Sequence, residues 1–160
     1  FEPAVEVEPD LIRGLFREPS LEQRMGARVH GASSAETGYG AELAMDGDPG
    51  TMWHSAWSDP SASHPHSITV SMIDPVELTG ITYQARQSGP NGMIDRYEVH
   101  VSDDGASWAL AASGRFTDSR APQAVSFGEA RRARFVRLTS LSSLGGGRYA
   151  SVAEIGLRVR

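Results

Sequence analysis

The sequence predicts an all-β fold, an antiparallel sandwich or jelly roll, and three observations support that class. Short runs of alternating apolar and polar residues recur along the chain, as in strands that bury one face. Clusters of Gly, Pro, Asn and Asp separate these runs and favour turns. Helical periodicity is weak except at residues 41–45, so the strands do not alternate with helices as a parallel sheet requires.

The strands follow one another from the first fifth of the chain to its end. We expect them at residues 25–30, 67–72, 80–85, 96–101, 108–111, 123–127, 133–139 and 153–159. In the fourth of these, Tyr97, Val99 and Val101 alternate with polar residues, which is the period of a strand with one buried face. Residues 102–105 then form a turn, and the Gly-rich segment 142–147 is expected to be a flexible loop.

Residues 1–20 differ in composition from the rest, because acidic residues and prolines are concentrated there. We expect this segment to be a linker or the tail of a preceding domain, and residues 21–160 to form one folded domain. The chain begins with Phe and shows no signal peptide, so we expect it to be a processed or excised piece of a longer protein.

The composition argues against several functions. A net charge of −5 predicts no strong attraction to nucleic acid or to an anionic membrane. The absence of Cys excludes disulfides and thiolate metal sites. No apolar run approaches the about 18 residues of a membrane-spanning helix. The Arg-rich run at residues 131–137 alternates along a strand, which indicates a solvated strand face rather than a nucleic-acid site.

The loop at residues 43–54 combines carboxylates, a hydroxyl and a tight Gly/Pro turn. Asp46, Asp48 and Thr51 supply oxygen atoms, the ligands that a hard cation such as Ca²⁺ prefers. Glu154, at the head of the last apolar strand, offers a further carboxylate for the same shell. The loop lacks the spacing and helical flanks of an EF-hand. The alternative is an Asp-Gly turn without a metal, and the loop residues alone leave both open.

No arrangement typical of hydrolysis is present, so we expect no catalytic residues. The chain has no Gly-x-Ser-x-Gly and no His-Glu-x-x-His motif. His64 and His66 lack a third, spaced zinc ligand and indicate a polar turn. Carboxylates for glycoside hydrolysis must face each other across a cleft, and Asp46 and Glu154 fit better as cation ligands.

A different set of side chains, in predicted loops or at strand ends, suits a sugar. His54, Arg86 and Asn91 offer fixed polar groups, and Tyr149 offers a flat aromatic face. Sugar hydroxyls are bound by charge-assisted hydrogen bonds, and the C–H face of a pyranose packs on an aromatic ring. Each residue also has a structural alternative: a satisfied histidine, an ion pair, a turn or an ordinary loop aromatic. Trp57 is expected either in the core or at the rim of the site.

The order and spacing of these motifs resemble the discoidin (coagulation-factor type C) superfamily. Within it the chain is most similar to carbohydrate-binding modules of family 32, a group that includes the N-terminal domain of galactose oxidase. The resemblance rests on residues 32–34, 46–54, 64–66, 83–87, 91–99, 101–108, 133–138 and 151–155. It covers residues 21–160 and implies an eight-stranded, jelly-roll-like, galactose-binding-domain-like sandwich with a structural Ca²⁺ or similar cation.

The resemblance also implies two sets of site residues. The cation ligands fall on the carbonyls of Leu43, Asp48 and Ala153 and on the side chains of Asp46, Thr51 and Glu154. The galactose-type site falls on His54, Arg86 and Asn91, with Tyr149 as the aromatic platform. Two positions depart from the family pattern, because Ala85 replaces a common Pro and Tyr149 replaces a common Trp or Phe. The preferred sugar is therefore open.

The expected function is that of a non-catalytic, monomeric carbohydrate-binding module that weakly binds terminal galactose or N-acetylgalactosamine. It would hold an attached, secreted enzyme, such as a glycoside hydrolase, near its glycan. The alternative is a discoidin-type adhesion or lipid-binding domain. We favour it less because the loops carry Tyr149 and Trp57 but no cluster of Leu, Phe or Met. An enzyme is a third class, which requires a cleft with perturbed carboxylates.

Overall fold

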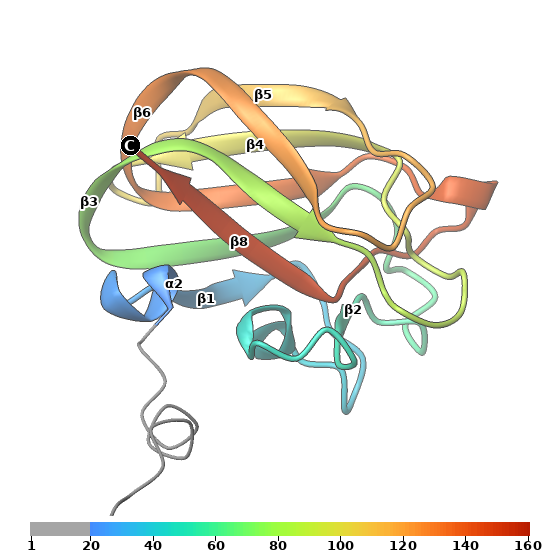
Figure 1. The fold of residues 1–160 in the computed structure, drawn as a ribbon. Coiled ribbons are helices and arrows are strands. Elements are labelled where there is room, and N and C mark those ends of the chain that lie inside the picture. The colour runs from blue at the N-terminus through green and yellow to red at the C-terminus, as the bar shows by residue number, and fades with distance from the viewer. Residues whose placement is uncertain (1–19) are drawn as a thin grey trace, which may run out of the picture.

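Two antiparallel sheets form the fold in the computed structural model, which describes residues 20–160 (Figure 1). The expectation of a linker at residues 1–20 falls, except for Ser20, outside these residues. The large sheet has the order β1 (Arg28–Ala32), β3 (His66–Gln84), β6 (Gln123–Ser140), β4 (Arg96–Ser102) and β5 (Ala109–Arg115), with β8 (Glu154–Val159) also paired to β3. The small sheet pairs β2 (Trp53–His54) with β7 (Ser151–Val152). The expected all-β sandwich is confirmed.

Two long strands build both layers of the sandwich. The pairing of β3 with β6 is interrupted between Ser71 and Val76 and then resumes. The first half of β3 pairs with β1 and the second half pairs with β8. Figure 1 shows both long strands curving round at one end of the molecule, so each contributes to two layers. The segments that the sequence predicts as separate strands, 67–72 with 80–85 and 123–127 with 133–139, are therefore continuous.

The core lies between these layers and follows the alternation of the strands. Ile68, Val70 and Ile81 of β3 and Val136 and Leu138 of β6 are almost fully buried. Successive side chains of a strand point to opposite faces, so each of these residues directs its side chain inward. This alternating burial is the pattern expected of strands that were predicted from a period of two in the sequence.

Short elements complete the fold, and some of them were not predicted. The helical turn expected at residues 41–45 is the 3-10 helix η1 (Ala41–Met45). The helix α2 (Leu21–Arg24), capped by Ser20, and the turn η2 (Leu144–Gly146) had not been expected. The strands β2 and β7 were also missed, because two residues are too few to show an alternating pattern. Within residues 20–160, no helix is long and apolar enough to cross a membrane.

Candidate functional site

Loops at one end of the sandwich enclose a cavity of about 340 Å³. It is lined by Tyr39, His54, Trp57, Arg86, Asn91 and Tyr149. All five residues that sequence reasoning assigned to a sugar site therefore line one cavity, although they lie far apart in the chain. Their binding role stays a prediction. Tyr39 was missed, and the only signal in the sequence was an aromatic residue between two glycines in a loop.

Aromatic rings form the wall of this cavity. The ring of Trp57 meets Tyr39 edge-on at 5.1 Å and His54 at 4.9 Å between centroids. The ring of Tyr149 lies tilted against His54, with 5.6 Å between the ring centroids. Because Trp57 remains 40% exposed, it stands at the rim and not in the core. The wall therefore offers several faces on which the C–H groups of a ring-shaped ligand can pack.

His54 is held in one tautomer at the base of the cavity. Its side chain is buried, and its Nδ1 donates to the carbonyl of Ser55 at 2.7 Å. The neutral imidazole consequently presents Nε2 as an acceptor. Burial lowers the pKa of His54 below 6.5; the hydrogen bond to Ser55 and the charge of Glu36 oppose this shift, whereas Arg86 adds to it. His54 is thus a neutral acceptor near pH 7.

Arg86 is fixed by carbonyl groups of its own loop. Its Nε donates to Ser88 at 2.5 Å and its Nη1 donates to Asn91 at 2.8 Å. Gly89 has a φ of +71°, and a Cβ there would lie 2.9 Å from the Arg86 Nη2, so a side chain at this position would crowd the guanidinium. Among residues 20–160, no acceptor hydrogen bonds to Nη2, so this edge of the guanidinium is available to a ligand. Burial and the nearby Arg120 lower the pKa of Arg86.

Asn91 is exposed, and its backbone is held from two sides. Its carbonyl accepts the bond from Arg86 and a second one from the Ser151 hydroxyl at 3.1 Å. Gly92, with a φ of +86°, passes so close to β7 that a Cβ would lie 2.8 Å from the Ala150 carbonyl carbon. The loop that carries Arg86 and Asn91 is therefore positioned by direct packing on the strand that pairs with His54.

Glu36 holds the loop of Trp57 from one side. Its carboxylate accepts from the backbone N–H groups of Trp57 and Ser58 at 2.8 Å, and from the Ser58 hydroxyl at 2.8 Å. These bonds, led by the one from Ser58, lower the pKa of Glu36. The carboxylate thus stays charged at neutral pH and fixes the first residues of the loop.

Arg148 holds the same loop from the other side. Its guanidinium donates to the carbonyls of Trp57 at 2.9 Å, Asp59 at 3.0 Å and Ala62 at 2.8 Å. It also lies 4.8 Å from the centre of the Tyr149 ring. Two aromatic residues of the cavity are therefore ordered before any ligand arrives, which reduces the entropy that binding costs. Neither Glu36 nor Arg148 was expected from the sequence, because their partners are backbone atoms of remote segments.

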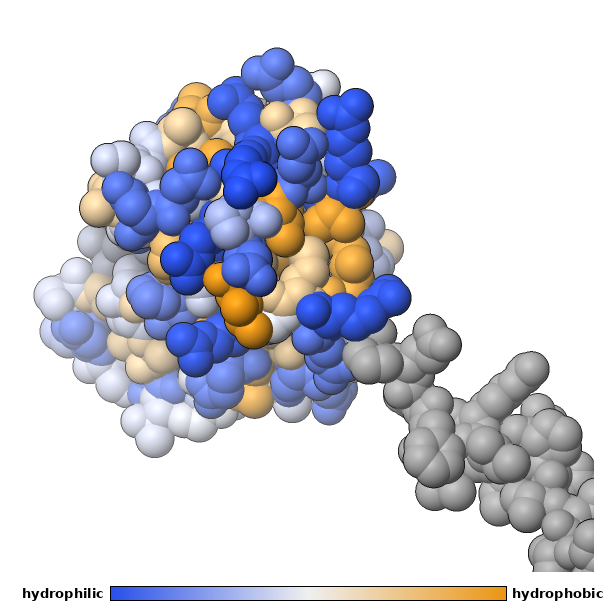
Figure 2. All heavy atoms as spheres, turned by 90° about the vertical axis from the view of Figure 1, so that its left-hand side faces the viewer, coloured by the Kyte–Doolittle hydropathy of each residue, from blue (hydrophilic) through white to orange (hydrophobic). Residues whose placement is uncertain are grey.

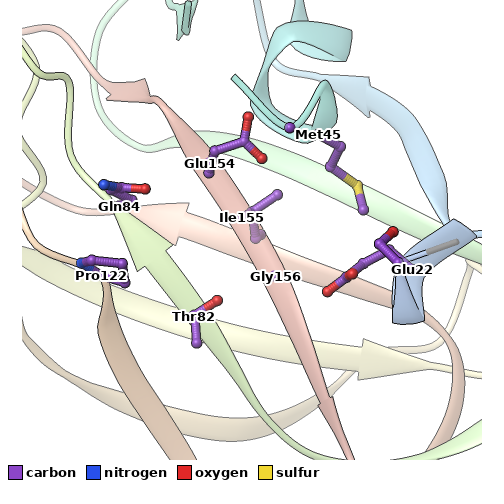
Figure 3. A pocket seen from close by; sticks show the side chains of 10 residues that line it. Glu22, Met45, Thr82, Gln84, Pro122, Glu154, Ile155 and Gly156 are labelled. Carbon is purple, nitrogen blue, oxygen red and sulfur yellow. The ribbon is translucent and has the colours of Figure 1, made fainter. Parts of the chain in front are cut away.

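A second cluster, the carboxylate pair of Asp46 and Glu154, lies at the opposite end of the β2–β7 ladder. Asp46 accepts from the Asp48 N–H at 2.9 Å and from the Thr51 hydroxyl, which also lies 3.0 Å from the Asp48 carbonyl. The Asp48 carboxylate turns away to accept from Gly50 at 2.8 Å. Figure 3 shows the Glu154 side chain projecting from the start of β8 towards the end of η1.

The carboxylate pair brings two acidic groups together without a positive charge within residues 20–160 to balance them. Burial, and then the adjacent Asp46, raise the pKa of Glu154 to about 8. Partial burial also acts to raise the pKa of Asp46, but bonds from Thr51 and Asp48 outweigh it and lower that pKa. Without a bound cation, the pair therefore keeps one proton at neutral pH. The Glu154 Oε1 is buried and has no hydrogen-bond partner among the described residues.

These residues fit a hard divalent cation. The donors are all oxygens, and a cation would supply the partner that the Glu154 Oε1 lacks. No group of three or more His, Asp or Glu side chains gathers within residues 20–160, so carbonyl and hydroxyl ligands would have to complete the shell. Leu43 in η1 and the buried Ala153 before Glu154 lie on the two segments that carry the carboxylates. The cation and its ligand set stay a prediction.

Comparison with known families is decisive for the identity of the fold. The family model described as F5/8 type C domain matches residues 30–155. The chain belongs to the F5/8 type C domain family. The discoidin resemblance inferred from the sequence is thereby confirmed.

Two curated relatives of this F5/8 type C domain are much longer proteins. A sialidase from Micromonospora viridifaciens is 39% identical over 131 residues, which is 81% of this chain and 20% of the relative. A galactose oxidase from Gibberella zeae is 35% identical over 130 residues, 78% of this chain and 18% of the relative. The chain thus spans about a fifth of the length of these relatives.

Two of the solved structures similar to this F5/8 type C domain are carbohydrate-binding modules of family 32, which are non-catalytic. One from C. perfringens, in complex with galactose, has a TM-score of 0.74 and 30% identity, covering 82% of this chain and 92% of that one. Another, from a family 31 glycoside hydrolase of Clostridium perfringens, has a TM-score of 0.81 and 28% identity, covering 88% and 94%. The jelly-roll-like architecture is thus confirmed.

Proposed function

We propose that this F5/8 type C domain is a non-catalytic carbohydrate-binding module whose cavity receives the terminal sugar of a galactose-type glycan. The observation that carries the proposal is the cavity itself, which joins a guanidinium edge, an imidazole acceptor and an amide to an aromatic wall. Similar modules support it, since one was solved with galactose and another with GalNAc-β-1,3-galactose.

Each group has a distinct task in this proposal. The free edge of Arg86 donates to sugar hydroxyls, His54 Nε2 accepts from one, and the Asn91 amide bonds to another. Tyr149 and Trp57 pack against the C–H groups of the ring. One shallow site cannot offset much of the entropy of association, so we expect a dissociation constant of about 0.1–10 mM.

Calorimetric titration with galactose, N-acetylgalactosamine and glucose tests this function. We expect saturable binding of the galactose-type sugars and weaker binding of glucose, which differs in the orientation of one hydroxyl. Arg86→Ala should abolish the signal, while Arg115→Ala, an exposed change outside the cavity, should leave it intact. No heat with any of these sugars, up to tens of millimolar, would contradict the proposal.

We propose further that Ca²⁺ occupies the carboxylate pair. Its ligands would be the side chains of Asp46, Thr51 and Glu154 and the carbonyls of Leu43, Asp48 and Ala153. A bound cation would neutralise the two carboxylates and tie the 46–52 loop to the start of β8. Its role is structural, because the pair lies apart from the sugar cavity and shares no lining residue with it.

The wider setting is also a proposal. The curated relatives, a sialidase and a galactose oxidase of which this chain spans about a fifth, support a module attached to a carbohydrate-active enzyme. We propose in addition that this enzyme is secreted and that the module acts as a monomer that targets it to glycans. The alternative of an adhesion or lipid-binding domain gains no support from the cavity rim, where Trp57 is the only exposed large apolar residue among the lining residues.

A further inference from the structure

A second cavity, of about 420 Å³, lies over the outer face of the large sheet and is lined by different residues from the first. Three adjacent strands build it. Arg28 of β1 pairs with Ser71 of β3, and Ser71 pairs with Phe135 of β6. The Phe135 ring meets His30 edge-on at 5.4 Å between centroids, and three basic side chains line the same cavity as this ring.

The side chains that line this cavity include basic residues but no acidic ones. Arg28, His30 and Arg134 line it, and no Asp or Glu is among its lining residues. Within residues 20–160, neither Arg28 nor Arg134 has a carboxylate within ion-pair distance; the four pairs involve other residues. Arg134 instead lies 5.9 Å from the centre of the Phe135 ring. Two exposed arginines without a carboxylate partner among the described residues therefore line the same cavity as the Phe135 ring.

Arginine side chains beside an aromatic ring favour a ligand that has both a negative charge and C–H groups. A guanidinium binds a carboxylate or sulfate through two parallel hydrogen bonds, and the half-buried ring of Phe135, which lines the cavity, can pack against C–H groups. A cavity of this size accommodates a sugar unit. We propose that it is a second binding site, for a saccharide that carries a carboxylate or a sulfate. The proposal does not depend on the first cavity.

Two macromolecular occupants are less favoured. A lipid surface would need a broad apolar patch, but Ile73 is the only large apolar side chain of the cavity that is exposed. Figure 2 shows the side of the molecule where β3 bends, and hydrophobic atoms there form small patches among hydrophilic ones. A nucleic acid would need a long basic surface, whereas the net charge of the chain is −5.

The test is a titration of the isotope-labelled protein, followed through its backbone amide signals at constant ionic strength. The probes are glucuronate, glucose 6-sulfate, neutral glucose and inorganic sulfate. We expect saturable shifts at His30, Ser71 and Phe135 with one or both charged sugars, at dissociation constants of about 1–10 mM. The response to each charged sugar shows whether carboxylate or sulfate is the recognised group.

Substitutions of the two arginines test whether the charged sugar contacts this cavity. Arg28→Gln and Arg134→Gln should each weaken binding about five- to tenfold, because a charge-assisted bond is lost at an exposed site. Arg158→Gln is the matched control, since Arg158 is exposed on β8 and lines neither cavity. Melting curves of all three variants, together with unchanged galactose binding, would show that the fold is intact.

Several results would overturn the proposal. Equal shifts with neutral glucose would remove the role of charge, and equal affinity for inorganic sulfate would indicate an adventitious ion only. Shifts confined to the cavity of His54 and Tyr149 would place the sugar elsewhere. Binding to vesicles containing phosphatidylserine, without any response to charged sugars, would favour a lipid surface instead.

Discussion

The two ends of the β2–β7 ladder carry two sites of opposite character. At one end, His54 pairs with Ser151, and Tyr149 lies two residues further back along the chain. At the other end, Trp53 pairs with Val152, and Thr51 and Glu154 flank the pair. The same short ladder therefore positions the aromatic cavity and the carboxylate pair.

The two sites differ in how many of their polar groups already have hydrogen-bond partners within the protein. At the cavity, Arg86 bonds to carbonyls of its own loop, Glu36 holds the backbone of Trp57 from outside the lining, and His54 has a fixed tautomer. In the carboxylate pair, two acids lie together and the Glu154 Oε1 has no partner among the described residues. A neutral sugar is best bound by polar groups fixed in advance, whereas a cation supplies the charge that completes its own site. We therefore expect the first site to govern affinity and the second to govern stability.

Removal of the cation should give the largest effect. A ligand that binds only the folded state stabilises it by about 2.7 kcal/mol at a hundredfold excess over its dissociation constant. Chelation should then lower the melting temperature by about 5–10 °C. Asp46→Ala should reproduce this loss, while Asp118→Ala, an exposed change outside the pair, should not. Equal melting temperatures of the Ca²⁺-loaded and chelated protein would contradict the assignment.

Replacement of Arg86 should produce the complementary result, a loss of affinity without a large loss of stability. Arg86→Ala leaves sugar hydroxyls without a charged donor, at a cost of about 1.5–3 kcal/mol, or roughly 10–150-fold in affinity. Arg86→Lys keeps the charge but cannot bond to both loop carbonyls as the guanidinium does, so it should bind almost as poorly. Calorimetry beside melting curves separates the outcomes: wild-type binding places the site elsewhere, and unfolding makes Arg86 structural.

Truncation of the aromatic platform should have a smaller effect. Tyr149→Ala removes stacking worth about 0.5–1.5 kcal/mol together with buried area, which predicts a roughly five- to twentyfold loss of affinity. Tyr149→Trp should retain or improve binding because the larger ring keeps the contact. Titration of both variants with galactose measures this. If Tyr149→Ala bound like the wild type, the contact surface would have to be Trp57 or Tyr39 instead.

The pH dependence of binding should be the smallest effect. The folded pKa of His54 lies below 6.5, so Nε2 stays an acceptor from pH 8 down past 6.5 and is protonated only at lower pH. Affinity should therefore be level above pH 6.5 and fall as the pH drops through the folded pKa. The stability that comes from neutral burial of His54 has the same sign: it is present above pH 6.5 and lost in acid. A His54→Gln variant titrated across this range provides the control, and an affinity loss that begins well above pH 6.5 would contradict the assignment.

Much of the fold was predictable because strand periodicity is local. The alternation in Ile68 and Val70, or in Val136 and Leu138, appears directly in the sequence and marks the buried face. Continuity of β3 through residues 73–79 did not appear, because the strand bends there and its exposed residues break the alternation. The two-residue strands β2 and β7 exist only through their mutual pairing, which no local pattern records.

By itself the sequence determined the chemistry of the cavity and of the carboxylate pair: the residue types at His54, Arg86, Asn91 and Tyr149, and the oxygens around Asp46. Only the tertiary structure decided which groups meet. It brought Tyr39 to the cavity, and it fixed the Trp57 loop through hydrogen bonds to Glu36 and Arg148. It also placed Glu154 beside Asp46 in a partly buried position, which raises the pKa of Glu154 to about 8. The physical reason is that donors and rings are properties of single residues, whereas distance, burial and charge coupling belong to remote segments packed together.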